Sequence, residues 1–175
     1  MLYKNPSRQL TTAHNGFTLI ELLVVISIAA LLMTIAVPNL KQMIGHQRVK
    51  AAANDFKSTV ALARSEARKT GLNTHIRQIG NTSGSWENMS EGWHVYNKKS
   101  GTVTIKLAHK IEAGSIKLKG NAKKGLVLAG KTGRINEEKL KEICFEDANN
   151  NSDISAYTVY VNKAGSAVIT ESETC

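Results

Sequence analysis

The sequence predicts an α+β fold, in which one long N-terminal α-helix, half transmembrane and half amphipathic, packs on an antiparallel β-sheet domain. Two observations predict it. Up to Thr70, an apolar run is followed by an amphipathic stretch with few helix breakers, whereas the rest of the chain holds short, partly alternating runs separated by glycines. The pattern up to Thr70 has the period of a helix, and the pattern of the rest is typical of strands. Because an amphipathic helix must bury its apolar stripe, we expect the sheet to cover it.

Residues 17–38 are the predicted transmembrane helix. The 21 residues from Phe17 to Val37 carry one charge, Glu21, in an otherwise apolar run. At about 1.5 Å per residue they make a helix roughly 31 Å long, which is enough to cross a bilayer core. A carboxylate in such a span costs about 2.5–3.5 kcal/mol at mid-membrane and less near the interface. We therefore expect Glu21 to have a partner; an acid that only complements the helix dipole is the alternative.

Residues 1–16 precede this span as a short polar leader that contains Lys4, Arg8 and His14 and no acid. Positive charge ahead of an apolar segment predicts a cytoplasmic N-terminus and a translocated remainder. Two alternatives stay open at this point. Thr34–Ala36 has the small residues of an ordinary signal cleavage site, and the span is also long enough to be an uncleaved anchor.

Residues 39–71 are the predicted amphipathic half of the same helix. Pro38 should kink the helix or relax it locally where the two halves meet. Gly71, which follows two basic residues, is a plausible C-cap. Apolar residues recur at steps of three and four and form one stripe. The stripe consists of Val49, Ala52, Ala53, Phe56, Val60, Ala63 and Ala67.

Residues 72–175 are predicted to form a globular β-rich domain. Asn162–Gly165 has the composition of a hairpin loop between its last two strands. The expected strands are Thr74–Ile79, Trp93–Tyr96, Thr102–Ala108, Ser115–Leu118, Leu126–Leu128, Ile143–Phe145, Ala156–Val161 and Ala167–Thr170.

Charge is segregated within this domain. Lys98–Lys141 holds 12 basic and 3 acidic residues, whereas Glu142–Cys175 holds Lys163 against 6 acids. A solvated surface explains this segregation, and so does a surface that orients against an anionic partner such as DNA phosphates or lipid headgroups. Aromatic residues are 5% of the chain, which gives little support to stacking on single-stranded bases. The candidate anion-binding residues, here called the basic belt, are Lys106, Lys110, Lys117, Lys119, Lys123, Lys124, Lys131 and Arg134.

Catalysis finds no support in the sequence, which lacks a G-x-S-x-G elbow, a C-x-x-C pair, an H-E-x-x-H motif and a phosphate loop. Asp147–Asp153 alternates like the first half of a calcium loop. However, Ser152 and Thr158 stand where such a loop needs a glycine and a bidentate glutamate. We favour an Asn/Asp-rich turn there. We therefore expect no enzyme, no cofactor and no metal site.

Two short segments give the sequence a specific resemblance. Gly16–Glu21, followed by an apolar stretch that ends in Ala36–Pro38, resembles the signal of type IV pilins and type II secretion pseudopilins. The resemblance implies that a prepilin peptidase cuts on the cytoplasmic side between Gly16 and Phe17 and methylates Phe17. It also implies that Glu21 pairs with the cationic N-terminus of a neighbouring subunit and sets the register of assembly.

The middle of the chain points to a subfamily. Ala51–Gly71 resembles the helix of FimT/FimU-type minor pilins and GspH-type pseudopilins, and Gly92–Tyr96 is similar to their G-W-x-V-[FY] strand. Gly133-Arg134 is similar to their first G-R turn, and Cys144 to their penultimate-strand cysteine. Pro38 and the close fit of the helix favour the pilus branch over the secretion branch.

Two cysteines occur, Cys144 and Cys175. The topology places both on the far side of the inner membrane, which is an oxidising compartment, so we expect a disulfide. Closing this loop should stabilise the fold by roughly 3–4 kcal/mol on the chain-entropy model. Two free thiols are the alternative.

The resemblance implies a minor type IV pilin, a structural subunit in pilus assembly or initiation that supports twitching motility and DNA uptake. It would be a single-pass inner-membrane protein with a cytoplasmic N-terminus and a periplasmic domain, and it would later enter the pilus with other pilins. The first alternative is a GspH-type pseudopilin of type II secretion. The second is a DNA-binding receptor of the competence pilus. Such receptors bind DNA through a C-terminal G-R-x-R stretch, but here Gly165–Val168 lacks both arginines.

Overall fold

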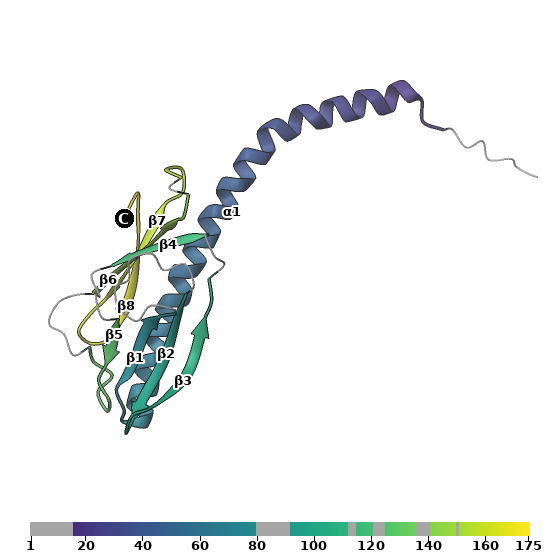
Figure 1. The fold of residues 1–175 in the computed structure, drawn as a ribbon. Helices are drawn as coiled ribbons and strands as arrows, with labels where there is room; N and C mark the ends of the chain where they lie inside the picture. Colours follow the sequence, from purple (N-terminus) through teal and green to yellow (C-terminus); the bar gives the residue numbers. More distant parts are fainter. Residues whose placement is uncertain (1–15, 80–91, 112–114, 121–124, 136–140, 150) are drawn as a thin grey trace, which may run out of the picture. The chain divides into compact units, whose positions relative to one another are not determined.

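A computed structural model describes residues 16–79, 92–111, 115–120, 125–135, 141–149 and 151–175. The chain divides into two compact units at Leu40, residues 1–40 and 41–175. Within the described residues there are one α-helix and eight strands (Figure 1). They are α1 (Leu19–Thr70), β1 (Thr74–Gln78), β2 (Trp93–Lys99), β3 (Thr102–His109), β4 (Ile116–Gly120), β5 (Leu126–Leu128), β6 (Lys141–Asp147), β7 (Ala156–Val161) and β8 (Ala167–Ser172).

The long helix ends where the sequence predicts. The last turn of α1 carries the basic residues Arg68 and Lys69, which suit the negative end of the helix dipole. Gly71 follows with φ of 69°, and its N–H donates to the carbonyl of Ala67 at 2.9 Å. This left-handed conformation costs a glycine little, so Gly71 is the C-cap.

The strands form two four-stranded antiparallel sheets, with the orders β3-β2-β1-β5 and β4-β6-β7-β8. The α+β fold class is therefore confirmed, and each of the eight predicted strands is present. The division into two sheets is a finding of the structure. Alternation predicts which face of a strand is buried, but not which strand lies next to it. Here β4 pairs with β6, although β5 lies between them in sequence.

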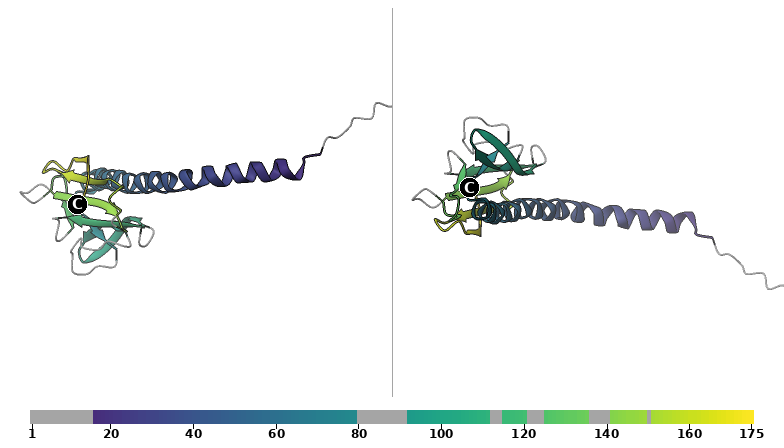
Figure 2. Two further views of the ribbon diagram at one scale, coloured as in Figure 1. Left: turned by 90° about the horizontal axis from the view of Figure 1, so that it is seen from above. Right: turned by 90° about the horizontal axis from the view of Figure 1, so that it is seen from below.

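One face of the second half of α1 supplies the core of the domain. All seven residues of the predicted apolar stripe are buried, and Gly45 and Thr59 extend the buried face. Figures 1 and 2 show both sheets beside this half of the helix. Phe56 packs on Trp93 of β2, with ring centroids 5.2 Å apart, and on Phe145 of β6, at 5.6 Å. A single helical side chain thus joins the two sheets.

Two features fix the C-terminal end of the domain. The β7–β8 hairpin turns through Asn162 and Gly165, as predicted: the Gly165 N–H donates to the Asn162 carbonyl at 2.8 Å, and Gly165 has φ of 74°. A disulfide joins Cys144 of β6 to Cys175, with the Cα atoms 5.8 Å apart. Because β7 and β8 lie between β6 and the chain end in sequence, the bridge holds the last residues against the sheet.

Candidate functional site

The first half of α1 exposes apolar side chains on every side. None of the residues from Leu19 to Val37 is buried. Within the part of the chain that the structure describes, α1 is the helix whose length and composition would let it cross a membrane. A helix that is apolar all round and uncovered needs an apolar environment from elsewhere, which is either lipid or other apolar helices.

The start of this helix is capped by Thr18. Its Oγ1 accepts the N–H of Glu21 at 3.2 Å, and its carbonyl accepts the N–H of Leu22 at 3.2 Å. Thr18 and Glu21 occupy the N-cap and N3 positions of a capping box, S/T-x-x-E/Q. The role of Thr18 was not predicted, although the T-x-x-E pattern is present in the sequence. Because a hydroxyl already satisfies the Glu21 amide, the exposed Glu21 carboxylate is available to another group.

Gly16 and Phe17 precede the helix. Neither has helical structure, and Phe17 is 87% exposed. Nothing lies within 4 Å of the point where a side chain on Gly16 would begin. The peptide bond between them therefore lies outside helical structure and next to an exposed side chain. Residues 1–15 of the expected leader lie outside the described residues.

Polar groups inside the apolar half are satisfied within the helix. The hydroxyl of Ser27 donates to the Leu23 carbonyl at 2.8 Å, and that of Thr34 donates to the Leu31 carbonyl at 2.7 Å. Pro38 lies inside α1, which continues past it. A proline has no N–H, so the carbonyl four residues earlier lacks its usual helical donor. The kink that we expect at Pro38 stays a prediction.

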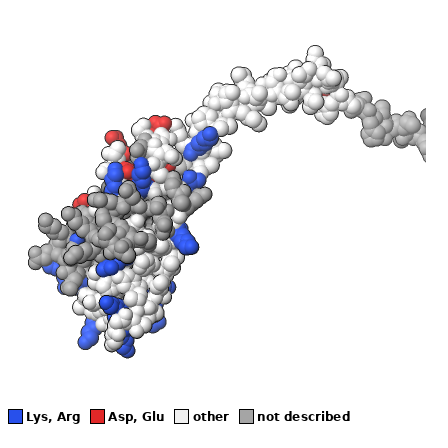
Figure 3. All heavy atoms as spheres, in the orientation of Figure 1, with Lys and Arg blue, Asp and Glu red and all other residues white. Residues whose placement is uncertain are grey.

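The basic belt is spread over several elements. Lys106 of β3 pairs with Glu66 of α1 at 3.1 Å, and Lys119 of β4 pairs with Glu146 of β6 at 2.9 Å. Figure 3 shows lysine and arginine side chains scattered over the visible face. Two belt cations thus already have carboxylate partners. Of the others, Lys117 lies on β4, Lys110 follows β3, Lys131 and Arg134 follow β5, and Lys123 and Lys124 lie outside the described residues.

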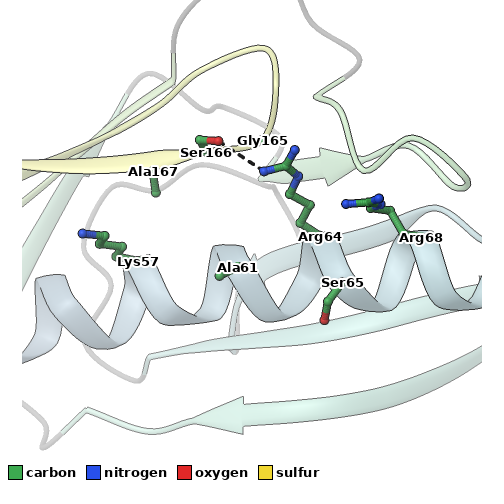
Figure 4. A pocket seen from close by; sticks show the side chains of 8 residues that line it. All are labelled: Lys57, Ala61, Arg64, Ser65, Arg68, Gly165, Ser166 and Ala167. Carbon is green, nitrogen blue, oxygen red and sulfur yellow. Dashed lines mark hydrogen bonds between the residues drawn. The ribbon is translucent and has the colours of Figure 1, made fainter.

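A second cationic feature escaped the sequence analysis. A groove of about 360 Å³ runs between α1 and the start of β8. It is shown in Figure 4 and is called the cationic groove below. It is lined by Lys57, Ala61, Arg64, Ser65, Arg68, Gly165, Ser166 and Ala167. The helical spacing of its basic residues can be seen in the sequence. The turn that forms the other wall cannot be predicted in this way, because it lies about a hundred residues further along the chain.

The segment Asp147–Asp153 forms turns. The Asn149 N–H donates to Oδ2 of Asp147 at 2.9 Å, and the Asp153 N–H donates to Oδ1 of Asn151 at 3.1 Å. These are Asx turns, in which a side-chain oxygen accepts from the backbone two residues on. The described residues contain no group of three or more His, Cys, Asp or Glu side chains that would hold a metal.

Two histidines on β1 and β2 lie beside a tyrosine. His75 stacks on Tyr96 with ring centroids 4.9 Å apart, and His94 lies 5.2 Å from the same ring. Burial, and then the nearby Arg77 guanidinium, lower the pKa of both imidazoles below the ordinary value. Near neutral pH both rings are therefore held in the uncharged form.

Comparisons with known proteins agree with this architecture. Residues 12–37 match the prokaryotic N-terminal methylation motif, and residues 52–165 match the type II transport protein GspH family. No curated protein matches the chain.

Solved structures with a similar fold come from two assemblies. The type IV minor pilin FimU of Pseudomonas aeruginosa, in two crystal forms, is 15% and 16% identical, with TM-scores of 0.59 and 0.54. These matches cover 74% and 72% of this chain and 96% and 98% of FimU. The minor pseudopilin EpsH of the Vibrio cholerae type 2 secretion system is 12% identical, with a TM-score of 0.52, covering 71% of this chain and 97% of EpsH. The GspH family model covers residues 52–165, and the methylation motif covers residues 12–37. The chain therefore belongs to the GspH/FimT family of type IV minor pilins and pseudopilins.

Proposed function

We propose that this protein is a minor type IV pilin that enters the inner membrane as a prepilin and then joins a pilus through its apolar helix. The observation that carries the proposal is the stem from Leu19 to Val37, which is apolar on all sides and contains no buried residue. Such a surface is stable in lipid and equally stable against the helices of other pilins. The protein can therefore pass from membrane to fibre without refolding, with its β-domain facing outward.

The leader is removed between Gly16 and Phe17 by a prepilin peptidase on the cytoplasmic side, and the new amino group of Phe17 is methylated. The non-helical, uncovered backbone at this bond supports the proposal, because a peptidase binds its substrate outside helical structure. Replacing Gly16 with a bulky residue should leave full-length precursor in the membrane. Intact-mass measurement of the isolated protein checks this, and normal maturation of the variant would refute the cleavage site.

Glu21 guides assembly by attracting the cationic N-terminus of a neighbouring subunit. A carboxylate in an apolar setting is stabilised only while it is paired. Glu21→Gln removes the charge but keeps a side chain that accepts hydrogen bonds, whereas Glu21→Val removes both. The Thr18 cap uses the backbone N–H of residue 21, so it is kept in both variants. We expect both variants to be cleaved and both to assemble poorly, measured as the amount of subunit in sheared pili relative to the amount in the membrane. Wild-type assembly of Glu21→Gln would show that the charge of this residue does not guide assembly.

Deleting the gene separates the three candidate functions. Loss of pili or twitching supports the minor pilin. Loss of exoprotein secretion with pili intact supports the pseudopilin, a candidate that the GspH family match over residues 52–165 favours. Loss of transformation with pili intact supports a DNA receptor. For that receptor the basic belt is the candidate surface, and a gel-shift titration at low salt tests it; the absence of a shift removes it.

A further inference from the structure

We propose that the cationic groove binds an extended acidic segment of a neighbouring subunit, whose carboxylates pair with Arg64 and Arg68. The identity of the partner as a subunit of the same fibre rests on the proposed function. The chemistry of the ligand rests on the groove itself.

The cations of the groove have no carboxylate partner among the residues that the structure describes. Lys57, Arg64 and Arg68 take no part in the ion pairs formed among the described residues. Arg64 donates from Nη1 to Oγ of Ser166 at 3.2 Å, but its Nε is buried without any hydrogen-bond partner. A buried donor without an acceptor is unfavourable, and so are like charges four residues apart on a helix. An oxyanion seated between Arg64 and Arg68 would relieve the repulsion between their charges.

The walls of the groove keep it open. Ala61 and Ala167 contribute only methyl groups, and Gly165 contributes none. A side chain at Gly165 would collide with the Gly133 carbonyl, and its φ of 74° disfavours any other residue. Figure 4 shows Arg64 rising from α1 to Ser166 at the start of β8, with Lys57 and Arg68 on either side of it along the helix. A groove with cations along one wall and small residues on the other suits an extended chain.

The strand above the groove points to a polypeptide. β8 stands at the end of its sheet, with β7 on one side and no other described strand on the other. Figure 4 shows the start of β8 running along α1. A strand edge offers an alternating row of backbone donors and acceptors, which an extended peptide complements in register. No aromatic side chain lines the groove, so nucleobases would find nothing to stack on.

The spacing of the arginines matches such a peptide. Arg64 and Arg68 are four residues apart, which is a rise of about 6 Å along a helix. Side chains two residues apart on an extended chain face the same way and lie about 6.6 Å apart. Carboxylates at alternate positions therefore meet successive arginines, whereas carboxylates on adjacent residues point to opposite sides.

A peptide titration tests this design. The full chain in nonionic detergent is titrated into fluorescein-labelled Thr-Glu-Thr-Glu-Val-Thr, and into Thr-Glu-Glu-Thr-Val-Thr, which has the same composition and charge; fluorescence anisotropy is measured. We expect at least tenfold tighter binding of the alternating peptide. Arg64→Gln/Arg68→Gln should weaken that binding at least tenfold. Lys98→Gln/Lys99→Gln removes the same charge from the end of β2 and should change it less than twofold.

Three results would overturn the inference: equal affinity for the two peptides, unchanged affinity in the arginine variant, or an oligothymidylate that binds more tightly through the same arginines. The first comparison uses only the wild-type chain, so it stands even if the variant folds poorly. Leader processing and pilus incorporation are measured separately. A chain that is processed and assembled but shows no peptide preference refutes the groove alone, and a chain that binds the peptide but is never processed refutes the function alone.

Discussion

Phe56 should carry a large share of the stability of the domain, because its side chain on α1 contacts both sheets. It is fully buried, and its ring packs on Trp93 from one sheet and on Phe145 from the other. Phe→Ala substitutions in well-packed cores cost about 3–5 kcal/mol, because apolar transfer is lost and a cavity remains. Each aromatic pair adds about 0.5–1.5 kcal/mol beyond its buried area. We expect Phe56→Ala to fall at the upper end of the 3–5 kcal/mol range.

The measurement is urea unfolding of the full chain in nonionic detergent, followed by near-ultraviolet circular dichroism, which reports aromatic packing. Domains of this size are stable by about 5–15 kcal/mol, so the variant should unfold at a much lower urea concentration. Leu62→Ala is the matched control, because Leu62 lies on the same helix but is 42% exposed. It should cost less than about 1 kcal/mol. A loss below about 1 kcal/mol for Phe56→Ala would refute the view that the two sheets are joined through this ring.

Two further predictions concern the bridge and the histidines. Cys175→Ser should lower the free energy of unfolding by roughly 3–4 kcal/mol, since the Cys144–Cys175 bridge closes a loop over a sequence separation of 31 residues. Reduction of the wild type by dithiothreitol should reproduce this loss in urea titrations; an unchanged midpoint in both would contradict it. His75 and His94 have lowered pKa values, chiefly from burial and then from Arg77, so they bind protons more readily when unfolded. Their contribution to stability is complete above the unfolded pKa of about 6.5 and is lost as the pH falls toward the folded value. The melting temperature should therefore drop between pH 7.5 and 5.5, and His75→Gln/His94→Gln should flatten that slope. Parallel slopes in the variant and the wild type would contradict the assignment.

The sequence predicts those parts of the structure that depend on local periodicity. The buried stripe from Val49 to Ala67 follows from steps of three and four, and the C-cap at Gly71 follows from its residue type. Strand existence follows from alternation, although β6 runs two residues further at each end than its apolar centre suggests, because backbone pairing continues through Lys141 and Asp147.

What depends on contacts between distant segments was not predictable in the same way. The pairing of β4 with β6 places a strand beside a partner that is not its neighbour in sequence. The cationic groove joins Arg64 to Ser166 across 102 residues, and a helix pattern shows the arginine without the turn that faces it. The members of the basic belt are close in sequence, but Lys106 and Lys119 project from different sheets to different carboxylates. Anion binding by the belt stays a prediction.

The two halves of α1 have different roles in a fibre subunit, because their apolar residues are buried to different extents. From Val49 onward the apolar residues occupy one stripe, and the protein's own sheets bury it, so this half is committed to the domain. From Leu19 to Val37 the apolar residues occupy every face and none of them is buried among the described residues, so this half has no core of its own. Its stabilisation must come from outside, and the exchange of lipid contacts for helix contacts changes the buried apolar area little. Apolar contact alone would therefore fix neither the depth nor the register of a subunit in a fibre. A charged group can do so, because it is costly wherever it lacks a partner, and Glu21 is the one charge in that stretch.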